Sequence, residues 1–106
     1  MQQISATDLQ SRINEPEFSA LLLDVREPHE FEYCHISGST LIPMQTIPNR
    51  VNDLPKDQTI ITICHHGMRS QQVAQFLEQN GFTDIFNLQG GVHAWASEVD
   101  NAMPTY

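Results

Sequence analysis

The feature that most constrains the fold is a pair of apolar runs, each as long as one β-strand. Residues 20–25 read ALLLDV, and residues 58–64 read QTIITIC. Both runs are nearly continuous, which predicts strands that are buried on both faces. Strands of this kind are typical of parallel sheets that carry helices on each side.

The segments around these runs predict helices and shorter strands in alternation. The clearest helix is residues 69–81, where Val73, Phe76 and Leu77 share one face and Gly81 follows the last turn. A first helix is predicted from an N-cap at Thr7, and another begins at Pro28. The other predicted elements are short strands at Ile4 and within 39–43 and 83–89, turns or a short helix in 43–55, and a last helix from Gly90. This order predicts one α/β domain over residues 1–106.

Composition excludes several classes of function. The formal net charge of -8 argues against a nucleic-acid partner, because such binding depends on Lys and Arg at phosphates. No apolar run approaches the roughly 20 residues of a membrane span, so no membrane contact is expected. The N-terminus has no secretion signal, which predicts a cytoplasmic protein whose Cys34 and Cys64 are free thiols.

The chemistry of the chain centres on Cys64, at the carboxyl end of the strongest strand. Ligands of parallel sheets gather at such ends. The following loop is turn-forming, Gly67 is free to take a positive φ, and a helix N-terminus favours negative charge. We predict a nucleophilic cysteine inside an anion cradle. The predicted cradle residues are His65, His66, Gly67, Met68, Arg69 and Ser70.

Two simpler interpretations of this loop are weaker. A lone cysteine at a strand end is usually a small buried apolar residue, but polar neighbours such as those after Cys64 are costly to bury. A metal site made of Cys64, His65 and His66 is disfavoured, because three consecutive residues do not easily converge on one ion. The sequence therefore predicts no metal.

Three segments of the chain resemble the rhodanese family. CHHGMRS (64–70) matches its active-site pattern Cys-x-x-Gly-x-Arg-Ser. LLLDVREPHEFEYCHISGSTLIP (21–43) matches the upstream pattern, and NLQGGVHAWASEV (87–99) resembles its closing Gly-Gly-x-x-Ala-Trp. The resemblance implies a single rhodanese domain of three layers, α/β/α, around a five-stranded parallel sheet. One departure is Cys34, where the family usually has glycine.

The resemblance also implies an activity, that of a thiosulfate sulfurtransferase. Cys64 would carry sulfur as a persulfide, taken from a small donor such as thiosulfate. The acceptor would be cyanide in vitro, and a thiol or a partner protein in the cell. Ping-pong kinetics are expected, and no cofactor is needed.

Roles for other residues follow from the same resemblance. Asp24 and Arg26 are expected to make buried or half-buried contacts that fix the strand end, and Glu27 is the candidate for orienting Arg69. His35, Gly38 and Ser39 are expected to shape a turn. His93 is expected on the helix surface and Trp95 in the core, whereas His65 and His66 are expected at the rim of the loop.

Two rival functions stay open. A cysteine in an amide cradle followed by arginine also serves phosphatase or arsenate-reductase chemistry, and some domains of this fold are interaction modules without catalysis. Cysteine phosphatases place five residues between the two side chains, whereas four separate Cys64 from Arg69 here. A shorter loop closes a tighter ring of amides, which suits one sulfur atom better than a phosphate.

Overall fold

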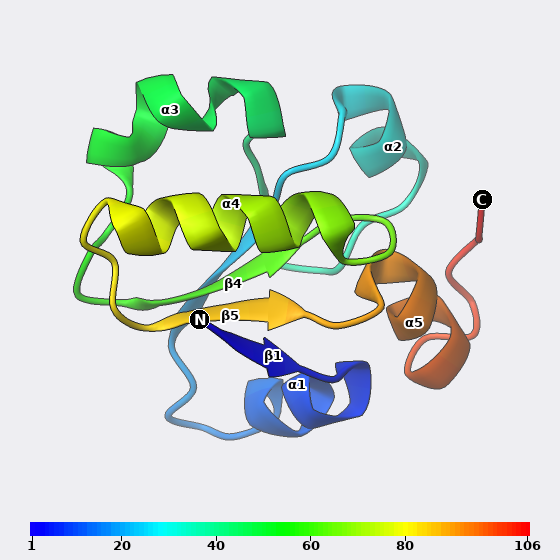
Figure 1. Cartoon of the computed structure of the whole chain (residues 1–106). Coiled ribbons are helices and arrows are strands. Elements are labelled where there is room, and N and C mark those ends of the chain that lie inside the picture. The colour runs from blue at the N-terminus through cyan, green and yellow to red at the C-terminus, as the bar shows by residue number, and fades with distance from the viewer.

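Every strand of the structure runs parallel to its neighbours, in one five-stranded sheet of order β1-β5-β4-β2-β3 (Figure 1). The structure is a computed structural model and describes all 106 residues. The strands are β1 (Gln2–Ile4), β2 (Ala20–Asp24), β3 (Thr40–Leu41), β4 (Thr59–Ile63) and β5 (Ile85–Leu88). The predicted α/β fold with five parallel strands is confirmed, and both apolar runs are strands near its centre.

Helices cover the two faces of this sheet. The helices are α1 (Ala6–Ile13), α2 (Pro28–Tyr33), α3 (Ile47–Arg50), α4 (Met68–Gln79) and α5 (Gly91–Glu98), with short 3-10 turns at Met44–Thr46 and Val51–Asp53. Figure 1 shows α3 and α4 on one side of the sheet, and α1 and α5 on the other. Three layers result, as the alternation of strands and helices predicts.

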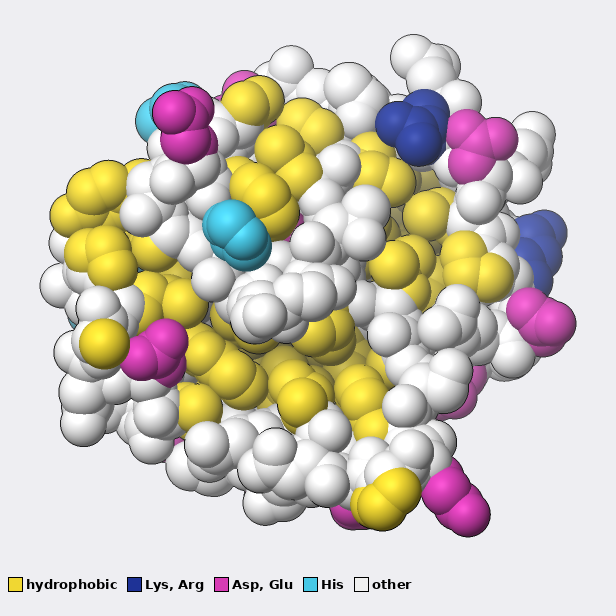
Figure 2. Space-filling view, turned by 180° about the vertical axis from the view of Figure 1, so that it is seen from behind, with side chains coloured by type: hydrophobic (Ala, Val, Ile, Leu, Met, Phe, Trp, Pro, Cys, Tyr) yellow, Lys and Arg dark blue, Asp and Glu magenta, His cyan; other side chains and the backbone are white.

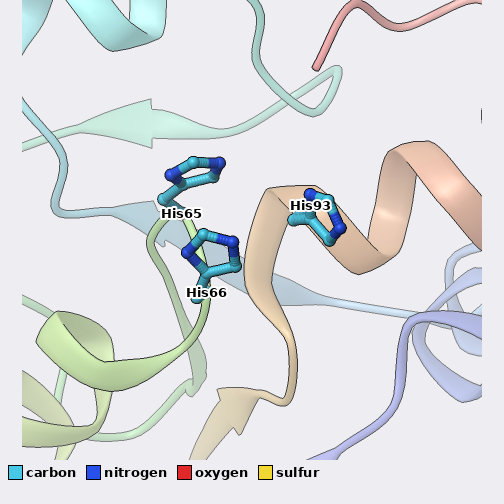
Figure 3. A group of neighbouring side chains, drawn as sticks. All are labelled: His65, His66 and His93. Carbon is cyan, nitrogen blue, oxygen red and sulfur yellow. The ribbon is translucent and has the colours of Figure 1, made fainter. Parts of the chain in front are cut away.

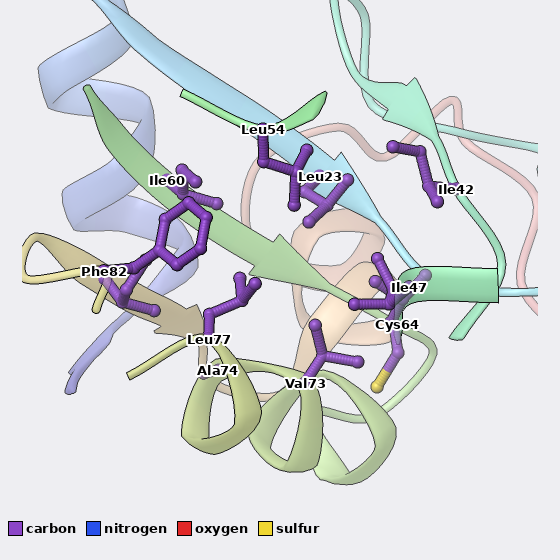
Figure 4. Close-up of a cluster of buried hydrophobic side chains, with 12 residues drawn as sticks. Leu23, Ile42, Ile47, Leu54, Ile60, Cys64, Val73, Ala74, Leu77 and Phe82 are labelled. Carbon is purple, nitrogen blue, oxygen red and sulfur yellow. The ribbon is translucent and has the colours of Figure 1, made fainter. Parts of the chain in front are cut away.

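Two apolar clusters, one on each face, hold the layers together. The first joins β2 and β4 to α3 and α4 through residues such as Leu23, Ile60 and Leu77, and it includes Cys64 (Figure 4). The second packs the opposite side chains of the same strands, such as Leu22 and Ile61, against α1 and α5. Alternate residues of one strand thus serve opposite clusters, which is why β2 and β4 lack a polar face.

The register of the strands brings separate polar residues to one edge of the sheet. Asp24 pairs with Ile63 at the last position of the β2–β4 ladder, and the Val25 N–H donates to the Ile63 carbonyl over 2.9 Å. The residues that follow β2 and β4 therefore begin side by side. Because β4 lies in the middle of the sheet, the segment after Ile63 is flanked by neighbours on both sides.

The start of α1 differs from the prediction. Thr7 was expected as N-cap, but the helix begins at Ala6 with Ser5 as its N-cap. The Ser5 side chain accepts the N–H of Asp8 over 3.1 Å, and Ala6 is buried in the second cluster. Burial of Ala6 draws the first turn against the sheet, which places Thr7 inside the helix.

The surface matches the acidic composition. Figure 2 shows the face opposite the view of Figure 1, with acidic side chains spread around its rim and apolar side chains in a hollow between them. The few Lys and Arg side chains in view lie beside acidic neighbours, so this face carries no basic patch. None of the helices has the length and apolar character needed to cross a membrane.

Candidate active site

Cys64 is the first residue after β4, and its sulfur is held by two donors of the loop that follows. The Gly67 N–H lies 3.1 Å from Sγ, and the Ser70 hydroxyl lies 3.3 Å from it. The residue is 1% exposed, so these donors act where little water competes. An N–H and an O–H at this distance can each hydrogen-bond to sulfur.

Gly67 gives the loop (residues 64–70) its shape. It is the N-cap of α4 with a φ of 102°, a conformation that side chains with a Cβ rarely adopt. A Cβ there would also lie 3.3 Å from both the Gly90 nitrogen and the Leu88 carbonyl oxygen. The sharp turn lets α4 begin at Met68, one turn from the sulfur. The first N–H groups of a helix have no acceptor within it, so they add positive potential around the loop.

The back of the loop is fixed by the first turn of α5. The Val92 N–H donates to the Cys64 carbonyl over 2.8 Å, and the His93 N–H donates to the His65 carbonyl over 3.0 Å. This close approach requires Gly91, where a Cβ would lie 2.4 Å from each of those carbonyl oxygens. Gly91 therefore lets the first turn of α5 hold the backbone carbonyls of the loop. The side chains of the loop take no part in these two bonds.

Asn87 joins the loop to the sheet, a role that the sequence reasoning missed. Its side chain is buried at β5 and donates to the Gly67 carbonyl over 3.1 Å. Its Oδ1 accepts from Ser70 Oγ, and from Thr62 Oγ1 over 3.3 Å. The Ser70 hydroxyl has one proton to share between Asn87 and Cys64 Sγ. A polar residue inside an otherwise apolar strand was the signal that could have identified Asn87.

Arg69 is paired with Glu30, which corrects the expectation for Glu27. The Arg69 guanidinium donates to both carboxylate oxygens of Glu30, over 2.8 and 3.0 Å. Glu27 precedes α2 and is exposed, whereas Glu30 lies one turn later, where its side chain faces the loop. The hydrogen bonds from Arg69 lower the pKa of Glu30 to about 2, and Glu30 in turn raises the pKa of Arg69.

Asp24 and Arg26 lie next to this pair and are completely buried. Arg26 Nε donates to Asp24 Oδ1 over 3.0 Å, and Nη2 donates to Oδ2 over 2.7 Å. Nη2 also donates to the Cys34 carbonyl over 2.7 Å. Burial opposes the charge of Arg26, but the bonds to Asp24 and Tyr106 outweigh it and raise its pKa. These bonds tie the end of β2 to the segment after α2.

Tyr106 connects the two arginine pairs, although no sequence pattern pointed to it. Its hydroxyl accepts from Arg26 Nη1 and donates to Glu30 Oε2, each over 2.8 Å. Its ring stacks on His65 with centroids 3.8 Å apart. Burial is the largest cause that raises the pKa of Tyr106 to about 12. A residue 42 positions after Cys64 in sequence thus lies at the rim of its loop.

The remaining predicted residues lie at the rim or outside it. His65 is half-buried, His66 is exposed, and Met68 is 77% exposed on the outer side of the loop. Burial, followed by the nearby His66, lowers the pKa of His65. His93 is exposed and lies near both (Figure 3), whereas Trp95 is buried in the second cluster.

The second thiol lies away from the loop. Cys34 and Cys64 are both free, but they belong to apolar clusters on opposite faces of the sheet. The turn after Cys34 is built as expected, because Gly38 has a φ of 85° and Ser39 Oγ donates to the Ile36 carbonyl over 2.6 Å. His35 instead bonds the Phe31 carbonyl through Nδ1 over 2.8 Å.

Comparison with known sequences agrees with these features. The family model of the rhodanese-like domain matches residues 5–98. Uncharacterized protein YqhL of Bacillus subtilis is 41% identical over 80 residues, which cover 76% of this chain and 64% of that protein. The chain thus spans less than two thirds of that relative. Thiosulfate sulfurtransferase GlpE of Stutzerimonas stutzeri is 36% identical over 76 residues, covering 72% of this chain and 70% of that protein.

Comparison with solved structures gives the same result. The crystal structure of a rhodanese-like domain protein from Staphylococcus aureus superimposes with a TM-score of 0.85 at 33% sequence identity. The match covers 100% of this chain and 99% of that one.

Proposed function

The chain belongs to the rhodanese-like domain family of sulfurtransferases, and from this premise we propose that Cys64 is its nucleophile and carries sulfur as a persulfide. One observation carries the proposal. The Gly67 N–H and the Ser70 hydroxyl both lie within hydrogen-bonding distance of Cys64 Sγ, at the N-terminus of α4. An anionic sulfur at this position meets the Gly67 N–H without rearrangement, and the Ser70 hydroxyl can turn its proton from Asn87 to the sulfur.

The reaction has two half-reactions. The Cys64 thiolate attacks the outer sulfur of thiosulfate, the sulfur–sulfur bond of the donor breaks, and sulfite leaves with the bonding electrons. An acceptor then attacks the outer sulfur of the persulfide and takes it, which restores the thiolate. Cyanide serves as acceptor in an assay and leaves as thiocyanate, and a thiol or a sulfur-accepting protein is the acceptor in the cell. Such covalent catalysis gives ping-pong kinetics.

The supporting residues have separate parts in this proposal. Arg69 supplies a fixed positive charge beside the loop, and Glu30 orients it. Asn87 positions Ser70, while Asp24 and Arg26 hold the adjoining strand end. Both cysteines are free thiols, as this chemistry requires at Cys64, and we expect the protein to work in a reducing compartment such as the cytoplasm.

The deciding experiment is the intact mass of the protein after incubation with thiosulfate. We expect the wild type to gain one sulfur atom and to lose it when cyanide is added. Cys34→Ser is the matched control and should gain the same sulfur, whereas Cys64→Ser should gain none. Sulfur transfer by Cys64→Ser at near the wild-type rate would overturn the proposal.

The same variants separate sulfur from phosphorus chemistry. Four residues separate Cys64 from Arg69, one fewer than in cysteine phosphatases, which favours sulfur chemistry in a tighter loop. We expect negligible hydrolysis of p-nitrophenyl phosphate by the wild type. Phosphatase turnover that Cys64→Ser abolishes would instead favour the phosphatase assignment.

A further inference from the structure

Three of the five histidines gather outside the sulfur, where the loop meets α5. His65 and His66 come from the loop, and His93 comes from the first turn of α5 (Figure 3). Each offers one ring nitrogen to a set whose members all lie within 4.8 Å of one another. This set differs from the consecutive Cys64, His65 and His66 that the sequence made implausible, because its third member comes from another element.

The backbone beneath the three rings is fixed. The His93 N–H donates to the His65 carbonyl over 3.0 Å, and the neighbouring Val92 N–H donates to the Cys64 carbonyl over 2.8 Å. Gly91 permits this contact, as described above. The backbone that carries His65 and His93 is therefore set before any ligand arrives, so binding one costs little backbone ordering.

The distances suit one small ion. Imidazole nitrogens around tetrahedral Zn²⁺ lie about 2.0–2.1 Å from the metal, and hence about 3.3 Å from each other. The nitrogens already lie within 4.8 Å of one another, so each pair must close by at most about 1.5 Å to reach that spacing. The ring centroids are already 3.9 Å apart for His65–His66, 5.1 Å for His66–His93 and 6.1 Å for His65–His93.

One polar atom of the cluster has no partner in the protein. The Nε2 atom of His65 is buried without any hydrogen-bond partner, which is unusual for a polar atom. The His65 ring is held from one side by Tyr106, at 3.8 Å between centroids. No positively charged side chain other than Arg69 belongs to the loop, and the whole chain is acidic. A cation at this place therefore meets an acidic protein and a prepared set of ring nitrogens.

We propose that His65, His66 and His93 bind one divalent transition-metal ion of the imidazole-preferring kind, such as Zn²⁺ or Co²⁺. Three imidazoles leave at least one coordination position open, as in zinc sites that accept water or an anion. The ion would lie at the entrance to the loop that holds Cys64. This proposal does not depend on sulfur transfer, because it uses none of the groups that contact the Cys64 sulfur.

The test is a titration of tag-free, EDTA-washed protein with Co²⁺, followed by visible absorption, and with Zn²⁺, followed by calorimetry. We expect one ion per chain and visible bands of nitrogen-coordinated Co²⁺. His93→Ala should weaken binding by at least about tenfold, the loss that removal of even an outer-shell partner produces. His66→Ala, an exposed loop position, should do the same, and circular dichroism should show that both variants are folded.

Two controls make the result decisive. His29→Ala removes an exposed histidine outside the cluster and should bind like the wild type. Cys64→Ser keeps all three imidazoles and should also bind like the wild type. Wild-type affinity in His93→Ala, or binding that only Cys64→Ser abolishes, would overturn the three-histidine site. Absence of any saturable Co²⁺ or Zn²⁺ binding to the wild type would overturn it equally.

Discussion

Two arginine–carboxylate pairs lie beside each other, and they differ in how they meet water. In the Asp24–Arg26 pair both side chains are 0% exposed, whereas in the Glu30–Arg69 pair Arg69 is 37% exposed and Glu30 is 10% exposed. The buried pair lies at the end of β2, and Arg26 also donates to the Cys34 carbonyl and to the Tyr106 hydroxyl. The outer pair joins α2 to the Cys64 loop.

This difference in exposure suggests different roles: the buried pair supports the fold, and the outer pair belongs to the proposed active site. Breaking a buried pair leaves an uncompensated charge with no water around it, so the fold depends on both partners. In the outer pair Arg69 is 37% exposed, so solvent screens this pair more than the buried one and it contributes less to folding. Its guanidinium can therefore turn toward an incoming anion at small cost. The same chemical pair thus serves folding at Arg26 and, in our proposal, sulfur transfer at Arg69.

The largest expected effect comes from breaking the buried pair. Asp24→Ala should lower the free energy of unfolding by about 3–5 kcal/mol, because Arg26 stays charged inside the core. Urea denaturation measures the change, and Arg69→Ala is the matched control from the outer pair. We expect a smaller loss in the control, because Arg69 is partly exposed and solvent screens its pair. Equal losses in the two variants would contradict the division between scaffold and site.

The next largest effect is on activity, and it should come from the outer pair. Arg69→Ala should reduce kcat/KM for sulfur transfer by about tenfold, or roughly 1.4 kcal/mol of transition-state stabilisation. This is less than the 10²–10³ lost with a fully desolvated donor, because Arg69 is partly exposed. Steady-state kinetics and urea denaturation on the same preparations check it. Unchanged kcat/KM would remove the Arg69 charge from the mechanism.

The pH dependence of stability gives a smaller and more specific signal. Arg69 lowers the pKa of Glu30 to about 2 from an ordinary 4.5. A carboxyl with a lowered pKa stabilises the fold above its ordinary pKa, and this stability is lost as the pH falls through the folded value. The difference in unfolding free energy between wild type and Glu30→Gln should therefore be constant above about pH 5 and shrink between pH 4.5 and 2.

Urea denaturation at several pH values measures this dependence, with Arg69→Ala as the second background. Without its partner, the pKa of Glu30 should move toward its ordinary value. Comparing Arg69→Ala with the Arg69→Ala, Glu30→Gln double variant should then give little pH dependence. If the pH dependence between pH 4.5 and 2 persists in the Arg69→Ala background, Arg69 is not its cause.

The smallest effect should come from the hydroxyl that links the pairs. Tyr106→Phe removes one acceptor from Arg26 and one donor to Glu30 but keeps the ring on His65. We expect a loss of about 0.5–1.5 kcal/mol in unfolding free energy, the usual net worth of a hydrogen bond. Thermal unfolding is the measurement. A loss as large as that of Asp24→Ala would mean that Arg26 depends on Tyr106 as much as on its carboxylate.

Local patterns in the sequence predicted the alternating strands and helices, and the number of strands came from the family resemblance. The runs at 20–25 and 58–64 are strands, and Gly81 follows α4 with a φ of 91°. The N-cap of α1 was predicted two residues too late, at Thr7 in place of Ser5. Both residues have a hydroxyl that can cap a helix, and the burial of Ala6 decides between them. Patterns of this kind depend on neighbours in the chain, which a sequence displays directly.

The site was predictable only in part, for a physical reason. The loop itself is contiguous, so Cys64 and Gly67 could be recognised together. The contacts of Arg69 and Ser70 depend on residues from other elements, such as Glu30, Asn87 and Tyr106. Choosing Glu30 over Glu27 requires knowing which side of α2 faces the loop. No local pattern contains that orientation.

The hydrogen bond from the Val92 N–H to the Cys64 carbonyl can form only late in the synthesis of the protein. A ribosome adds roughly 5–20 residues per second, so α5 is completed seconds after Cys64. Until then the Cys64 carbonyl lacks this donor, and the loop that holds the thiol lacks one of its backbone supports. In the finished molecule that support is present and Cys64 is 1% exposed.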